Sequence, residues 1–187
     1  MDLDRFPPSL GLVELSSIAR GIETVDRMLK AAEVDLVLAR TVCSGKYIVV
    51  VGGELDRVEA SMAAGVANAA ECAVDHFIIQ NVHPDVYPAL TSTGVIERRE
   101  ALGVLESFSV ASLVEAVDRV AKAAPVAVVE CRIAMALGGK AFLVFTGDVD
   151  AVRASLDAGA EVIEARGLLV NRVLIPDPRP ELFETLL

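Results

Sequence analysis

The sequence has no tryptophan, and aromatic residues make up only 4% of its 187 residues. Apolar residues still account for 53% of the chain, mostly as Ala, Val and Leu, so the core must close through small side chains in close contact. Together with 24% charged residues, this content is typical of a globular chain and excludes a disordered one. The length allows one domain or two small ones.

Positive charge is also scarce. Lys and Arg number 17 against 27 Asp and Glu, which gives a net charge of −10. Nucleic acids and anionic membranes both require a positively charged face, so we expect neither as a partner. The first residues lack the pattern of a signal peptide, and no apolar run reaches about 18 residues, so we also expect no membrane span.

Cysteine is rare and odd in number. Cys43, Cys72 and Cys131 follow no zinc or haem spacing. Without a secretion signal we expect a reducing cytosol, where thiols or a metal role are favoured over disulfides. We place Cys72 in the second helix and Cys131 in the second strand of their repeats, and interpret both as filling residues.

The chain repeats itself. Residues 11–43 align with 103–135, and 14 of 33 positions are identical. Two extra residues then enter the second copy, and residues 46–65 align with 140–159 with nine of 20 identical. We therefore predict two domains. The predicted ranges are an N-terminal tail over 1–9, a first domain over 10–90, a linker over 91–100 and a second domain over 101–187.

In each copy the spacing of apolar residues indicates strands and helices. Apolar or β-branched runs predict strands at 11–15, 34–43, 47–51 and 77–79, with counterparts that include 101–105 and 173–175. Helical spacing puts one set of residues on a helix face, and the copies repeat it. The expected fold class is α/β of the α+β kind: two tandem β-α-β-β-α-β, ferredoxin-like domains, each an antiparallel sheet with two helices on one face. The helix faces are Ile18, Ile22, Val25 and Leu29, then Leu55, Val58, Met62 and Val66; their counterparts are Val110, Val114, Val117 and Ala121, then Val149, Val152, Leu156 and Ala160.

Several runs resemble the shell-protein domain of bacterial microcompartments. They are ALGVLE (101–106), VEAVDRVAKAAPV (114–126), TGDVDAVRASLDAG (146–159) and LIPDP (174–178). The first copy, residues 11–46, resembles the first half of tandem-domain shell proteins of propanediol-utilisation compartments. The resemblance covers about residues 10–187. It implies a structural protein without enzyme activity, located in a microcompartment shell in the cytoplasm.

The family also implies partners and a pore. Tandem members form homotrimers that imitate hexamers and tile the shell with other shell proteins around a set of enzymes. The loop between the second and third strands of each unit faces the axis of the ring. Here those loops hold Thr41, Val42, Cys43, Ser44, Gly45 and Lys46 in the first copy, and Met135, Ala136, Leu137, Gly138, Gly139 and Lys140 in the second.

Cys43 is the candidate metal ligand. Its counterpart in the second copy is Met135, so only one of the two loops carries a thiol. The resemblance implies a 4Fe-4S cluster held by three Cys43 thiolates at the pore, since a related member has a cysteine in a matching T-x-C-x-G-K loop. Three thiolates leave one iron to a non-protein ligand. Ser44 stands where the family often has Pro. The alternative is that Cys43 is a small buried apolar residue.

Two further pairs repeat. Lys30 and Lys122 end equivalent helices, and the family implies that they meet neighbours at the tile edge; the alternative is a cation at a helix C-terminus. Glu14 and Glu106 end equivalent strands and are interpreted as structural. Two other functions stay open at this point: a shell tile with a plain metabolite pore, and a tandem regulatory protein that binds a small ligand.

Overall fold

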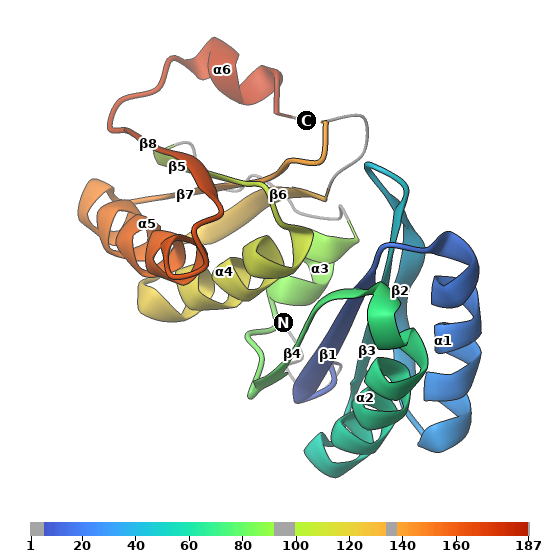
Figure 1. Ribbon diagram of the computed structural model, residues 1–187. Helices are drawn as coiled ribbons and strands as arrows, with labels where there is room; N and C mark the ends of the chain where they lie inside the picture. The colour runs from blue at the N-terminus through green and yellow to red at the C-terminus, as the bar shows by residue number, and fades with distance from the viewer. Residues whose placement is uncertain (1–5, 92–99, 134–137, 187) are drawn as a thin grey trace. The chain divides into compact units, whose positions relative to one another are not determined.

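A computed structural model describes residues 6–91, 100–133 and 138–186 of the chain. The chain divides into two compact units, Met1–Pro84 and Asp85–Leu187 (Figure 1). Each unit has a four-stranded antiparallel sheet, and the expected β-α-β-β-α-β order is confirmed in both. Among the helices in the described ranges, none has the length and apolar character needed to cross a membrane.

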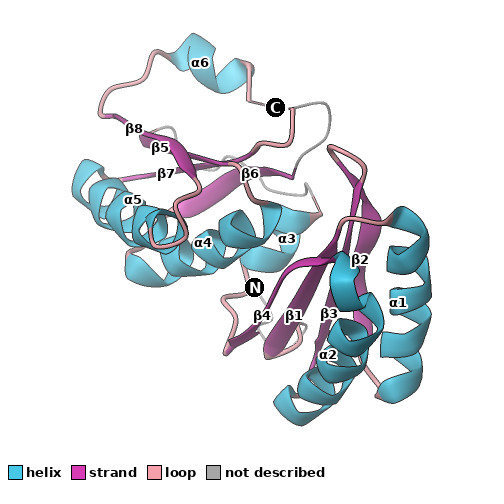
Figure 2. Ribbon diagram, in the orientation of Figure 1, coloured by secondary structure: helices cyan, strands magenta, loops and turns pink. Residues whose placement is uncertain are grey.

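The first unit has the strand order β2-β3-β1-β4, with α1 and α2 on one face of the sheet (Figure 2). The side-chain hydroxyl of Ser17 caps α1 by accepting from the backbone N–H of Arg20. The elements are β1 (Ser9–Leu15), α1 (Ile18–Ala31), β2 (Asp35–Val42), β3 (Lys46–Gly53), α2 (Leu55–Ala69), a 3-10 helix (Ala70–Cys72) and β4 (Ala73–Gln80).

The core of the first unit lies between the sheet and its two helices. Of the residues expected on one face of this helix, Val58 and Met62 are buried in the core and Val66 packs against it. The central strand β1 is buried along its whole length, so its residues are packed on both faces of the sheet. The buried members of this cluster are Val13, Leu15, Met28, Val49, Val51, Val58, Met62 and Ala69.

The apolar face predicted for α1 does not lie on the sheet. Ile18, Ile22 and Leu29 are 40%, 58% and 41% exposed, and only Val25 of that set packs against the core. The buried positions of α1 are instead Gly21, Thr24 and Met28. The helix was therefore predicted, but its orientation was not.

A glycine and a threonine with both of its hydrogen bonds made inside the unit allow α1 to approach the sheet closely. A Cβ atom at Gly21 would lie 2.5 Å from ring atoms of Tyr47, so the helix could not pack there with a larger residue. The buried hydroxyl of Thr24 donates to the Arg20 carbonyl oxygen and accepts from the Asn68 side chain. These contacts place polar and small residues where the sequence pattern alone would favour the aliphatic ones.

The second unit repeats this arrangement with strand order β6-β7-β5-β8 and helices α4 and α5 on one face. A short C-terminal helix, α6, covers the opposite face through the buried ring of Phe183, which packs with Leu102 and Val144. The elements are α3 (Val86–Leu90), β5 (Ala101–Ser107), α4 (Val110–Ala123), β6 (Ala127–Ile133), β7 (Ala141–Gly147), α5 (Val149–Glu164), β8 (Leu169–Ile175) and α6 (Pro180–Glu184).

The short helix α3 changes the boundary between the units. It packs against β6 and α4, so residues 85–90 group with the second unit although the sequence placed them in the first domain. The first unit accordingly ends at Pro84. Most of the predicted linker, residues 92–99, lies outside the described residues.

Equivalent glycines on the two central strands generate a stability prediction. A Cβ at Gly103 would overlap the ring of Phe145, whereas one at Gly11 would lie 2.6 Å from the side chain of Met62. A flexible thioether can move aside but a packed ring cannot. We expect Gly103→Ala to lower the free energy of unfolding by about 1–3 kcal/mol and Gly11→Ala to lower it by less. Urea unfolding of both variants measures this, and equal losses would contradict it.

Candidate functional site

The first candidate hairpin joins β2 to β3 through the three turn residues Cys43, Ser44 and Gly45. Val42 pairs with Lys46 at its base. Gly45 has a φ of 78° in the left-handed region, and no other atom lies within 4 Å of where its Cβ would be. Such a residue is typical of three-residue hairpin loops. Cys43 is therefore held at the tip of a short hairpin, where it is half-buried.

The second hairpin lies between β6 and β7. Gly138 and Gly139 have φ values of 62° and 89°, which favour glycine, and Lys140 immediately precedes β7. The other residues predicted for this loop, Met135, Ala136 and Leu137, lie outside the described residues. The described part is a tight turn that a side chain would strain.

Each hairpin is tied to the central strand of its own sheet by an ion pair. The Lys46 Nζ donates to Glu14 Oε1 at 2.5 Å, and the Lys140 Nζ donates to Glu106 Oε1 at 3.0 Å. The Glu14 side chain is completely buried, whereas that of Glu106 is 32% exposed. The acids that the sequence marked as structural are thus the partners of the hairpin lysines.

Sequence reasoning missed these ion pairs, although one signal was available. The chain has only four lysines, and they form two repeat-related pairs: Lys30 with Lys122, and Lys46 with Lys140. Both acids are kept in both copies as well. A cation and an anion that are retained together in a duplicated chain are candidates for contact.

The three thiols lie in different surroundings. The sequence predicted Cys72 in the second helix, but it is the last residue of the 3-10 helix that follows α2. Its carbonyl oxygen accepts from the backbone N–H of Ser16 at 2.8 Å. Cys131 is buried in β6, where burial raises the pKa of its thiol to about 12 and the Glu130 charge adds to the effect. Cys131 therefore stays protonated and is a poor metal ligand.

A cluster bound by Cys43 would need thiols from more than one chain. The described ranges of one chain contain no group of three or more His, Cys, Asp or Glu side chains that could hold a metal ion. Cys43 is one thiolate donor at a hairpin tip, and 4Fe-4S clusters take several thiolates. The donor chemistry of Cys43 fits such a group only when several copies of the hairpin meet.

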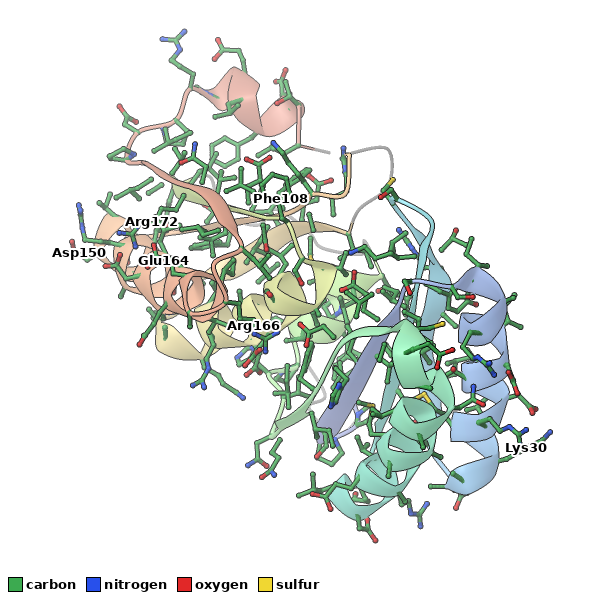
Figure 3. All side chains as sticks on the ribbon, viewed as in Figure 1. Lys30, Phe108, Asp150, Glu164, Arg166 and Arg172 are labelled. Carbon is green, nitrogen blue, oxygen red and sulfur yellow. The ribbon has the colours of Figure 1, made fainter. Side chains whose placement is uncertain are left out.

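The two predicted edge lysines differ in environment. Each stands in the last turn of its helix and donates to an aspartate four residues earlier: Lys30 to Asp26 at 2.6 Å, and Lys122 to Asp118 at 2.7 Å. The Lys30 side chain is 72% exposed and projects from the end of α1 (Figure 3), whereas that of Lys122 is 36% exposed. Both ammonium groups lie near a helix C-terminus, which favours a cation.

A groove of about 580 Å³ lies between α2 and the edge strand β4 of the first unit. In the second unit an ion pair of 3.0 Å between Arg172 of β8 and Asp157 of α5 spans the corresponding position. The two units therefore differ at this surface. The groove is lined by Glu59, Met62, Ala63, Val66, His76, Phe77 and Ile78.

Comparison with known proteins agrees with this duplicated fold. The BMC domain model matches residues 9–82 and 101–178. The chain is 37% identical over 175 residues to the bacterial microcompartment shell protein PduT of Citrobacter freundii, covering 94% of this chain and 95% of PduT. It is 39% identical over 85 residues to the shell protein EutM of Salmonella typhimurium, which covers 46% of this chain and 86% of EutM.

A solved structure supports the same relationship. The crystal structure of a microcompartments protein from Desulfitobacterium hafniense has a TM-score of 0.87 and 48% sequence identity, covering 94% of this chain and 98% of that one. The relatives PduT and EutM are structural shell proteins and not enzymes, as the sequence led us to expect for this chain. The chain therefore belongs to the BMC-domain family of microcompartment shell proteins and carries two such domains in tandem.

Proposed function

We propose that the chain forms a homotrimer with a hexagonal outline and tiles the shell of a bacterial microcompartment in the cytoplasm, together with other shell proteins and around enclosed enzymes. The observation that carries this proposal is the pair of BMC domains, since three tandem chains present six domains around one axis. The exposed apolar residues Ile18, Ile22 and Leu29 of α1 also favour assembly, because monomers rarely leave such a patch uncovered.

The hairpins are the proposed pore. Cys43 occupies the tip of the first one, so threefold symmetry would bring three thiols to the axis. Lys46 does not serve as their counter-cation, because its ammonium group already pairs with the buried carboxylate of Glu14. Three converging thiolates repel one another unless a metal neutralises them. A bound 4Fe-4S cluster would supply one-electron transfer across the shell. In the second candidate function the axis is a plain metabolite pore.

The oligomeric state is the first test. Three chains of 19.8 kDa give a mass of about 59 kDa. We expect this mass in multi-angle light scattering at micromolar concentration, because the exposed α1 face and paired domains favour a closed ring. A stable monomer would contradict the proposal.

The cluster is tested by the Cys43→Ser variant. We expect anaerobically reconstituted protein to hold about four iron atoms per three chains, and the variant to lose iron and visible absorbance while keeping its oligomeric state. Cys72→Ser is the matched control, because Cys72 is half-buried like Cys43, and it should keep the iron. If wild-type protein binds no iron, or if Cys43→Ser retains it, the plain-pore function stands instead.

The edge is tested by replacing Lys30 and Lys122 together with Glu. We expect the trimer to persist and extended sheets to disappear in electron micrographs. A boundary ion pair contributes only about 0.2–1 kcal/mol, but the clash recurs at every contact of a facet. Arg179→Glu makes the same charge change at a site whose side chain is 85% exposed, and should leave the sheets intact. Normal sheets from the double variant would place the edge elsewhere.

A further inference from the structure

We propose that Glu14 is a positioning residue for Cys43 and acts through Lys46. This role rests on the proposed function of the first hairpin as a pore element. Lys46 is the first residue of β3 and follows Cys43 by only three positions. Its Nζ reaches Glu14 Oε1 at 2.5 Å, and the Glu14 side chain is fully buried. The ion pair therefore joins the hairpin to a point inside the fold.

Glu14, the buried partner of the hairpin lysine, lies on β1, the most constrained strand of the unit. β1 is hydrogen-bonded to β3 on one side and β4 on the other, and all seven of its residues are buried. Glu14 cannot leave this position, and a buried carboxylate without a partner is strongly unfavourable. Lys46, whose side chain is 23% exposed, is therefore held where Glu14 requires it. This restricts the location of Cys43, because only Ser44 and Gly45 separate it from Lys46.

Two of the three turn residues contribute little packing. Ser44 and Gly45 are exposed, and no heavy atom beyond the neighbouring residues lies within 4 Å of where a Cβ of Gly45 would be. The two strands and the ion pair at their base therefore contribute to the restraint on the turn. Loss of the pair should let the hairpin open more often.

The second copy provides a matched control. Lys140 and Glu106 make the same pair at 3.0 Å, with side chains 39% and 32% exposed, but the loop sequence 134–140 of this hairpin contains no cysteine. Changing Glu106 repeats the chemistry of changing Glu14 in the other unit. If Glu14 positions Cys43, substitution of Glu14 should change the reactivity of Cys43 and substitution of Glu106 should not.

The experiment measures the rate at which Cys43 reacts with a maleimide, together with amide hydrogen exchange of residues 42–46. It uses the metal-free, full-length chain with Cys72→Ser, so that failure of the cluster proposal leaves the result unaffected. Cys131 does not compete, because it is buried and the pKa of its thiol is about 12. We expect Glu14→Gln to raise both rates roughly tenfold, as the loss of one charge-assisted hydrogen bond allows. Glu106→Gln should leave both unchanged.

Two further variants separate position from charge. Glu14→Gln also leaves the positive charge of Lys46 without this carboxylate partner, so a direct effect of that charge on the reaction must be separated from an effect of position. Lys46→Gln removes the charge, so positioning predicts a faster reaction and a charge effect predicts a slower one. Lys46→Arg keeps the charge and the reach, and should keep the slow rate.

The double variant Glu14→Gln with Lys46→Gln covers the case in which a single variant fails to fold, because it buries no lone charge. Positioning predicts that it also reacts faster than the parent. Three results would overturn the proposal: no change in Glu14→Gln or in the double variant, a slower reaction in Lys46→Gln, or an equal acceleration in Glu106→Gln.

Discussion

Complete burial of β1 is the constraint on which the first unit depends. A strand with neighbours on both edges and packing on both faces tolerates no unsatisfied polar group. Glu14 must therefore find its cation inside the fold, and Lys46 provides it. On the other face Gly11 lacks a side chain because Met62 of α2 occupies that place. The hairpin anchor and the close helix contact are thus two consequences of the position of one strand.

The order of helices and strands could be predicted because duplication presents every pattern twice. The short helices α3 and α6 were missed, because a helix of five residues is too short to show a period. A repeat signal was nevertheless present: each helix follows the last strand of its copy, and PDVYPAL (84–90) aligns with PELFETL (180–186). The orientation of α1 could not be predicted from its period either. An apolar stripe shows that a helix is amphipathic, but the sheet lies against Gly21, Thr24 and Met28, whose suitability depends on Tyr47 and Asn68 far along the chain.

The candidate site shows a similar division. The loops that carry Cys43 and the diglycine Gly138–Gly139 could be located from sequence, because turn residues between two strands are a local signal. The Glu14–Lys46 contact was missed, since its partners are 32 residues apart and meet through the register of β1 and β3. The presence of both charges in both copies marked them as candidates but did not show that they touch. The differing exposure of Lys30 and Lys122 depends on what surrounds two helices of nearly the same sequence, which no local pattern records.

The unequal hairpins have an evolutionary consequence. In a ring built from one single-domain chain, a mutation in the hairpin appears in every subunit and must be tolerated at all of them at once. A duplicated gene removes that requirement: Cys43 is present in one copy while Met135 stands at its counterpart, and the second copy is two residues longer at this hairpin. The anchoring acid and lysine are present in both copies. Duplication thus let selection act on the two hairpin tips separately while the framework beneath them stayed common to both.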